Sequence, residues 1–327
     1  MYDHRPAVAA RTARQGGSYA CMEFARKHGA LMVLVLLVGV NLAFTPNFAN
    51  VNTFWNMMIQ VSSVLLVALG MTVVISSGGI DISVGSIMAI ASIVTAKALG
   101  FGVGPAIVAG LATAALFGAF SGFMISKFKI QPIIVTLTIM ISGRGIAQVI
   151  NDAQLLNFTE PSFSFFGTHR LFGVVPVQVL IVGIAVASVY FLMNRMTFGL
   201  YVQAIGDNGK ASRLSGVNIP LVMIGIYGIS ALLAGTAGLL ETARLSAADA
   251  NSIGKLIELD AIAAVAVGGT PLNGGKARVI GTAIGALIMI VITVSVNMNN
   301  IPYAYALVLK SIIIILAIYL QRERRRV

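Results

Sequence analysis

The chain has 327 residues, of which 57% are hydrophobic and only 10% are charged, and its formal net charge is +11. So few charges, with a mean hydropathy of +0.92, exclude an ordinary soluble domain of this length. The basic residues interrupt apolar runs instead of forming one stripe, which argues against a nucleic-acid-binding protein.

Ten apolar segments approach the length of roughly 20 residues that crosses a bilayer as a helix. The sequence therefore predicts an all-α integral membrane protein with about ten transmembrane helices, at 29–45, 54–76, 82–99, 104–125, 132–150, 174–194, 218–241, 256–270, 279–298 and 303–320. We expect a disordered basic arm at 1–28, a polytopic transmembrane domain at 29–320 and a basic tail at 321–327. No small-residue cleavage site follows the arm, so the first span is expected to be retained.

Glycine-rich stretches interrupt the pattern twice, and we expect broken or re-entrant segments near 76–82 and 256–278. Irregular backbone is tolerated at membrane depth only where protein or water surrounds it. The pairs Gly78-Gly79 and Gly268-Gly269 are either a repeat of the kind that marks transporter substrate sites or a chance recurrence among 34 glycines. The spacings Gly118/Gly122 and Gly281/Gly285 predict close helix packing.

Lysine and arginine are concentrated in the arm, the tail and alternate loops, with sixteen there against three in the opposite loops. The positive-inside rule therefore predicts that both termini are cytoplasmic. The outer loop at 151–173 contains four phenylalanines, which suits an interfacial segment or a docking surface. The inner loop at 195–217 is the longest polar stretch within the hydrophobic part of the chain.

Asp81 and Ser83 stand at the first break. Asp81 follows two glycines and precedes an apolar run, so it is expected to cap the next helix. Contact with a substrate is the other interpretation of Asp81. Ser83 either contacts a substrate or satisfies local backbone groups.

Arg144 lies well inside the fifth apolar segment, and Gln148 follows one helical turn later. An ion at that depth is costly and usually faces a cavity or the interior of a bundle. Arg144 is otherwise a buried partner of Asp81, Asp152 or another acid, or an arginine that snorkels to the interface. Lys310 in the last segment is likewise an interior pair or a snorkelling residue.

Four polar residues stand at the outer entrance of the eighth segment, namely Asp249, Asn251, Glu258 and Asp260. Carboxylates and amides bind hydroxyl groups in directed pairs, although these residues also suit partner docking or a solvated loop. With Asp81, Ser83, Arg144 and Gln148 they form the predicted substrate pathway.

Catalytic and metal-binding patterns are absent from the sequence. One cysteine and three separated histidines give neither a disulfide framework nor a metal cluster. The stretch Gly274-Gly275-Lys276-Ala277 lacks the first glycine of a phosphate loop and has alanine where its hydroxyl belongs. We therefore expect no metal and no cofactor in this chain, and if ATP drives the protein, ATP-Mg binds to another chain.

Four ordered stretches together resemble the ribose-type sugar permeases of bacterial ABC importers, from about residue 54 to about 320. They are GMTVVISSGGIDISVGSIMA, KIQPIIVTLTIMISGRGIAQVI, AIGDNGKASRLSGVN and ELDAIAAVAVGGTPLNGG. Within that family, the combination of Lys129-Ile-Gln-Pro132, Gly143-Arg144-Gly145-Ile-Ala-Gln148 and Ala248-Asp249-Ala-Asn251 is most similar to the galactofuranose-type permease.

The resemblance implies a permease domain at 29–320 in the bacterial inner membrane, surrounded by lipid. It also implies three partners: a sugar ABC ATPase inside, a periplasmic sugar-binding protein outside and a second permease subunit, identical or paralogous. The family's ATPase-coupling loop maps onto Ala204, Gly206, Asp207, Asn208, Ala211, Arg213, Leu214, Ser215 and Gly216. We expect a short amphipathic docking helix there, ending at Gly216. Many family members have an acidic residue after the asparagine, where this chain has Gly209-Lys210.

The sequence thus favours the permease subunit of an ATP-driven importer of a monosaccharide, with galactofuranose as one candidate. The alternative is an ion-coupled secondary transporter in which Asp81, Arg144 or Glu258 couples proton or sodium movement. A membrane enzyme is disfavoured because no nucleophile and base stand at catalytic spacing.

Overall fold

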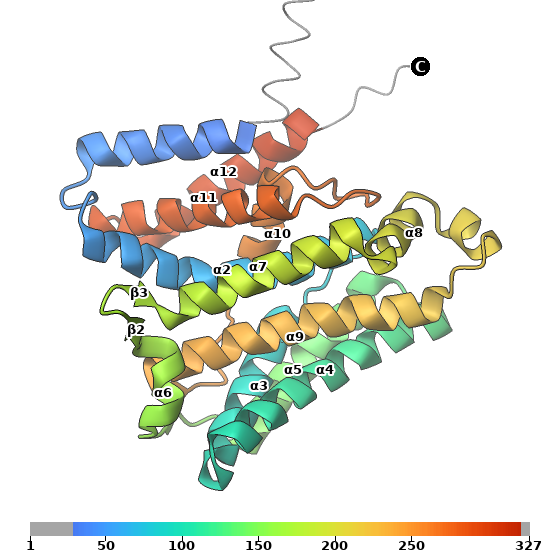
Figure 1. The fold of residues 1–327 in the computed structure, drawn as a ribbon, viewed down its shortest axis with the longest axis horizontal. Helices are drawn as coiled ribbons and strands as arrows, with labels where there is room; N and C mark the ends of the chain where they lie inside the picture. The colour runs from blue at the N-terminus through green and yellow to red at the C-terminus, as the bar shows by residue number, and fades with distance from the viewer. Residues whose placement is uncertain (1–28, 322–327) are drawn as a thin grey trace, which may run out of the picture.

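A computed structural model of the chain describes residues 29–321. The long helices lie side by side as a bundle, with helix α6 near one end and helix α8 at the other (Figure 1). We call these the α6 end and the α8 end. Most of the expected arm and tail, residues 1–28 and 322–327, lies outside the described residues.

The first helix spans Gly29–Phe44. The helices that follow are α2 (Val51–Ser76), α3 (Val84–Ala98) with the 3-10 turn η1 (Leu99–Phe101), α4 (Val103–Phe128), α5 (Pro132–Ile150), α6 (Pro161–Thr168), α7 (Val177–Arg195), α8 (Thr197–Leu214), α9 (Ile219–Leu245), α10 (Ile257–Val267), α11 (Val279–Met298) and α12 (Tyr303–Gln321). Two-residue strands form two antiparallel pairs: β1 (Leu156–Asn157) with β4 (Ala247–Ala248), and β2 (Arg170–Leu171) with β3 (Val175–Pro176).

The prediction of an all-α membrane protein is confirmed. Seven of the described helices are long and apolar enough to cross a membrane, and Gly29–Phe44 and Ala304–Ile315 are shorter apolar helices. The remaining expected span, the eighth, is α10, whose 11 residues rise only about 16 Å. A hydrocarbon core of about 30 Å needs more, so α10 is a partial helix, as the glycine content near 256–278 suggested.

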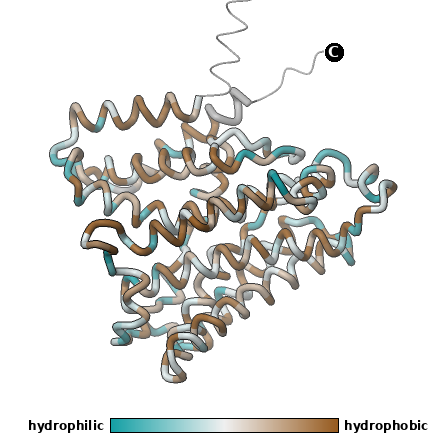
Figure 2. Tube along the Cα trace, in the orientation of Figure 1, coloured by the Kyte–Doolittle hydropathy of each residue, from teal (hydrophilic) through white to brown (hydrophobic). Residues whose placement is uncertain are grey.

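Hydropathy follows this arrangement, because hydrophobic residues fill the helices while hydrophilic ones gather where the chain turns (Figure 2). Helix α2 is the central helix, and every residue from Val64 to Ser76 is buried. The outer helices instead expose large apolar side chains, such as Val108 and Leu116 of α4. A helix that is apolar on all sides is either buried or faces lipid, and this bundle contains both kinds.

Glycine contacts hold the helices close together. Gly118 and Gly122 of α4 lie against the backbone of α9, and Gly281 and Gly285 of α11 lie against the end of α10. A Cβ atom at any of the four would overlap a backbone atom of the neighbouring helix. The prediction of close helix packing at both spacings is therefore confirmed.

The outer loop at 151–173 is partly helical. Helix α6 packs against α9, with Phe163 fully buried and Gly167 against the backbone of Arg244. The hydroxyl groups of Ser164 and Ser246 also meet at 3.0 Å. Phe163 is thus a core residue, whereas Phe165 keeps 40% of its surface exposed. Only part of the expected interfacial or docking surface is available to a partner.

The helices before the two breaks, α2 and α10, end in the same kind of turn. After α2, Gly78 has a φ of +85° and the Gly79 amide donates to Val74 O; after α10, Gly269 has a φ of +87° and the Thr270 amide donates to Val265 O. A residue in this left-handed conformation followed by such a hydrogen bond is a Schellman motif, which favours glycine. Each glycine pair therefore ends a helix in the same way.

Candidate functional site

Arg144 of α5 bridges two separate segments through backbone oxygens. Its Nη1 donates to the carbonyls of Ala250 and Ile253, each at 2.7 Å, and its Nη2 donates to Gly85 O at 3.2 Å. A planar guanidinium suits several acceptors in one plane, which a lysine ammonium does not. Arg144 thereby attaches the stretch before α10 to the first turn of α3.

Further polar side chains surround Arg144. Gln148 Nε2 donates to Asn251 Oδ1 at 2.8 Å, and Asn251 Nδ2 donates to Ala153 O at 3.1 Å. Asp249 accepts from the Asn251 amide at 2.8 Å and from Ser252 Oγ at 2.6 Å. The carboxylate of Glu258 is near enough to interact electrostatically with the guanidinium of Arg144. We call Arg144, Gln148, Asp249, Asn251 and Glu258 the Arg144 cluster. Five of the eight predicted pathway residues therefore lie together at one place.

The electrostatic environment keeps Asp249 ionised. Desolvation alone would raise the pKa of Asp249, but hydrogen bonds from Ser252 and Asn251 and the charge of Arg144 outweigh it, so the pKa lies below its ordinary value of 3.8. Negative charge at Asp249 therefore persists at every physiological pH.

The N-terminal ends of α3 and α10 meet beside Arg144. A Cβ atom at Gly85 would overlap the carbonyl oxygen of Gly254 and would lie 2.9 Å from Glu258 Oε2. Helix N-termini carry partial positive charge, and the first turn of α10 contains the acids Glu258 and Asp260. Only a glycine at position 85 permits this approach.

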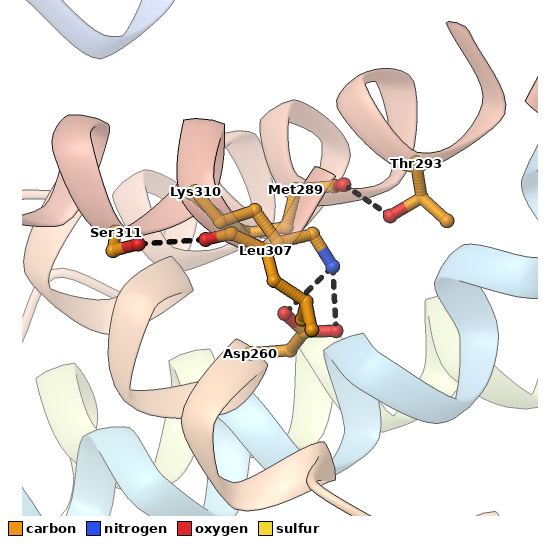
Figure 3. Close-up of polar contacts among 6 residues, drawn as sticks. All are labelled: Asp260, Met289, Thr293, Leu307, Lys310 and Ser311. Carbon is orange, nitrogen blue, oxygen red and sulfur yellow. Dashed lines mark hydrogen bonds and ion pairs between the residues drawn. The ribbon is translucent and has the colours of Figure 1, made fainter. Parts of the chain in front are cut away.

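Asp260 pairs with Lys310 of α12. Lys310 Nζ lies 2.8 and 2.9 Å from the two carboxylate oxygens of Asp260 (Figure 3). The Lys310 side chain is 5% exposed and the Asp260 side chain 21%. Of the two interpretations of Lys310, the interior pair is therefore correct. It is the one ion pair found among the described residues.

Asp81 lies in a different place, buried between the first break and α9. One carboxylate oxygen accepts from the Ser83 amide at 3.0 Å and from Ser83 Oγ at 2.5 Å, and the other accepts from Ser230 Oγ at 2.9 Å. The N-cap of α3 is Ser83, so the expectation that Asp81 occupies that position is wrong. Asp81 instead holds the turn that leads into α3, because its short side chain reaches the amide two residues on.

Arg144 also does not pair with Asp81 or Asp152, and its donors go to the carbonyls described above. Sequence reasoning missed Ser230, which anchors Asp81 from α9, and Tyr227 one turn earlier, whose buried hydroxyl finds no partner among residues 29–321. Both are polar residues on the buried face of an apolar helix, and that signal was available in the sequence.

The predicted coupling loop forms helix α8, which is divided at Asn208. Asn208 leaves helical geometry with φ −154° and ψ 93°, and its Oδ1 accepts from the Lys210 and Ala211 amides at 3.1 and 3.0 Å. A second short helix therefore starts after Asn208 and ends at Leu214, with Gly216 at a φ of +85°. We call residues 208–216 the projecting segment, which extends beyond the bundle at the right of Figure 1.

Exposure separates the residues predicted for ATPase coupling into two kinds. Ala204, Asp207, Asn208, Ala211, Arg213, Leu214, Ser215 and Gly216 are exposed, and Leu214 keeps 90% of its surface. Gly206 instead faces the bundle, where a Cβ atom would overlap Ser76 O. Gly206 therefore contributes no surface to a partner that docks on the projecting segment.

The Arg144 cluster combines a cation, two amides and two carboxylates, so it contains both hydrogen-bond donors and hydrogen-bond acceptors. No group of three His, Cys, Asp or Glu side chains in the part of the chain that the structure describes could hold a metal ion.

Comparison with known proteins places this geometry in context. Residues 53–318 match the family described as branched-chain amino acid transport system / permease component. The chain is 37% identical over 316 residues to the ribose import permease protein RbsC of Escherichia coli K12, covering 95% of this chain and 98% of that protein. It is 33% identical to the galactofuranose transporter permease protein YtfT of the same organism, covering 90% and 89%. The fructose import permease protein FruF of Bifidobacterium longum is 34% identical, covering 80% and 77%. No solved structure matches the chain.

Proposed function

Since the chain belongs to the family of permease components described as the branched-chain amino acid transport system type, and within it to the sugar importer permeases, we propose that it is the membrane subunit of an ATP-driven monosaccharide importer. ATP is hydrolysed by a partner chain, and alternating access of this chain moves the sugar.

The projecting segment carries the proposal. It combines a leucine that is 90% exposed with the exposed basic residues Lys210 and Arg213, and it follows a kink that extends it beyond the bundle. An apolar side chain that is so exposed on a short helix suits a partner's groove. An ion-coupled transporter, which works without an ATPase, has no need of such a segment.

The orientation follows from charge. The projecting segment and the loop after α10 carry the basic residues that the positive-inside rule assigns to the cytoplasm, so the α8 end faces the cytoplasm of a bacterial inner membrane and both termini lie there. The α6 end faces the periplasmic sugar-binding protein. A second permease, identical or paralogous, completes the pathway. Cysteine reporters at Phe172, which is fully exposed, and at Leu214 should be labelled from opposite sides.

The substrate proposal rests on the Arg144 cluster and on the relatives. The similar permeases named above are importers of ribose, galactofuranose and fructose. Carboxylate and amide groups, which the Arg144 cluster contains, bind the hydroxyl groups of such sugars in directed hydrogen bonds. Ribose and galactofuranose are therefore the first two sugars to test.

The experiment is to purify the chain with a sugar ABC ATPase and a periplasmic sugar-binding protein of the same organism. ATP hydrolysis is measured while binding protein loaded with each sugar is added. Stimulation by one sugar-loaded form, and not by the empty form, supports the proposal and identifies the sugar. Failure of the ATPase to associate with the chain contradicts it.

A further inference from the structure

Three segments that are distant in sequence meet backbone to backbone at the α8 end. The Gly275 amide donates to Ser76 O at 3.0 Å, and Ser76 Oγ donates to Lys276 O at 3.1 Å. Gly206 of α8 lies on this pair, because a Cβ atom there would overlap Ser76 O and lie 2.6 Å from Gly275 N. We call the contact of Ser76, Gly206 and Gly275 the glycine junction.

The end of α2 and the loop between α10 and α11 are joined at more than this one point. One turn before Ser76, the hydroxyl groups of Thr72 and Thr282 meet at 2.7 Å. A Cβ atom at Gly274 would lie 2.9 Å from Gly78 N and 3.1 Å from Gly206 Cα. Because they touch on both sides of the junction, the end of α2 and the loop between α10 and α11 are held together as one unit against α8.

Each segment leads from the junction to the Arg144 cluster. From Ser76 the chain passes through the first break to α3, whose Gly85 carbonyl accepts from Arg144. From Gly275 the chain leads back through α10, whose first turn contains Glu258. One contact on α8 is therefore connected along the chain to both segments that Arg144 bridges, the first turn of α3 and the stretch before α10.

We propose that the glycine junction transmits movement of α8 to both breaks at once, and that Gly206 is the positioning residue through which it does so. This rests on the proposed function, in which an ATPase docks on the projecting segment. The kink at Asn208 separates the segment that docks from the part of α8 that presses on the bundle. Close-packed backbone contacts transmit displacement without the slack of a long side chain.

The junction makes Gly206 different from Gly183, which lies inside the neighbouring helix α7. A Cβ atom at Gly206 meets backbone on two sides, whereas one at Gly183 has nothing within 4 Å. Both changes place an alanine inside a helix, so Gly183→Ala is a matched control for Gly206→Ala.

The experiment measures sugar uptake per ATP hydrolysed by the full complex in proteoliposomes, with the amount of bound ATPase determined for each variant. Gly206→Ala should keep the ATPase bound but lower the coupling ratio by roughly tenfold, since coupling between sites usually amounts to about 5–150-fold. Gly183→Ala should remain within about twofold of the unmodified protein. A merely structural role for Gly206 would change the yield of complex and not this ratio.

A second variant protects the test against misfolding. Ser76→Ala removes only the hydroxyl bonds to Lys276 O and Thr72 O, so it weakens the junction without adding an atom. It should lower the coupling ratio in the same direction as Gly206→Ala. If both variants keep the normal ratio of sugar uptake to ATP hydrolysis, the junction proposal is wrong and the importer proposal stands. The same conclusion follows if Gly206→Ala is not inserted and Ser76→Ala keeps the normal ratio. If the unmodified complex shows no ATP-dependent uptake, the importer proposal itself fails.

Discussion

Ser230 of α9 donates a hydrogen bond at 2.9 Å to the carboxylate of Asp81, 149 residues earlier in the chain. Both side chains are buried, and the same carboxylate holds the Ser83 amide and hydroxyl. Asp81 therefore attaches the first break to the middle of a long helix. The Ser230 hydroxyl carries no charge, so the carboxylate of Asp81 acts there as a hydrogen-bond acceptor and not as one half of an ion pair.

We expect Asp81→Asn to retain transport and Asp81→Ala to lose it. Asparagine keeps an oxygen that accepts from Ser83 and gains an amide that donates to Ser230 Oγ, whereas alanine leaves buried donors unsatisfied at about 1–3 kcal/mol each. Sugar uptake and the thermal midpoint of the purified protein measure the difference. Equal inactivity of both variants would show that the charge itself is required, as an ion-coupled transporter demands.

Arg144 is expected to require its guanidinium and not only its charge. Arg144→Ala and Arg144→Lys should both be inserted at normal levels yet lose most uptake, because an ammonium cannot hold the carbonyls of Ala250, Ile253 and Gly85 together. Arg244→Ala, at an exposed arginine near the end of α9, is the control and should transport normally. Full uptake by Arg144→Lys would reduce the role of Arg144 to a point charge.

Breaking the pair of Lys310 and Asp260 should destabilise the protein, and removing both charges should not. A buried ion left without its partner costs about 3–5 kcal/mol, while an apolar pair of similar volume is often tolerated. Lys310→Met should therefore lower the thermal midpoint, and Lys310→Met with Asp260→Leu should restore it. A double variant that is stable but inactive would place this pair in the sugar pathway, and one that stays unstable would contradict the expectation.

The hydrogen-bonded structure of residues 249–253 should persist in acid until the pH falls below the ordinary pKa of an aspartate. The pKa of Asp249 is lower in the folded protein than its ordinary 3.8, so its hydrogen bonds stabilise the stretch fully above that pH and are lost as the pH falls through the folded pKa. Hydrogen exchange of the amides of residues 250–253 should stay constant from neutral pH down to about pH 4, after correction for intrinsic rates. Protection that is already lost near pH 5 would contradict this.

The spans were predictable because hydropathy over a window of about 20 residues measures what a bilayer selects. The α10 segment was predictable as broken for the same reason, since its apolar run is too short and ends in two glycines. The Schellman turns at Gly78 and Gly269 likewise follow from the local sequence.

The partners of the polar residues were not predictable. Asp260 and Lys310 are 50 residues apart, and Arg144 binds backbone oxygens that no sequence pattern identifies. Gly206 was assigned to the ATPase-coupling loop because the family resemblance maps that loop onto it, yet a glycine has no side chain that reveals which way its position faces. Such contacts depend on how helices pack, and a single sequence does not contain that information directly.

Uptake of radiolabelled sugar into proteoliposomes tests the central claim most directly. The vesicles contain this chain with its partner permease and ATPase. The sugar-loaded binding protein is added on the side of the membrane that the α6 end faces, and ionophores collapse every proton and sodium gradient. We predict that the sugar accumulates only when the ATPase is supplied with ATP, and that the ionophores leave the rate unchanged. Accumulation driven by an ion gradient without ATP would contradict the account.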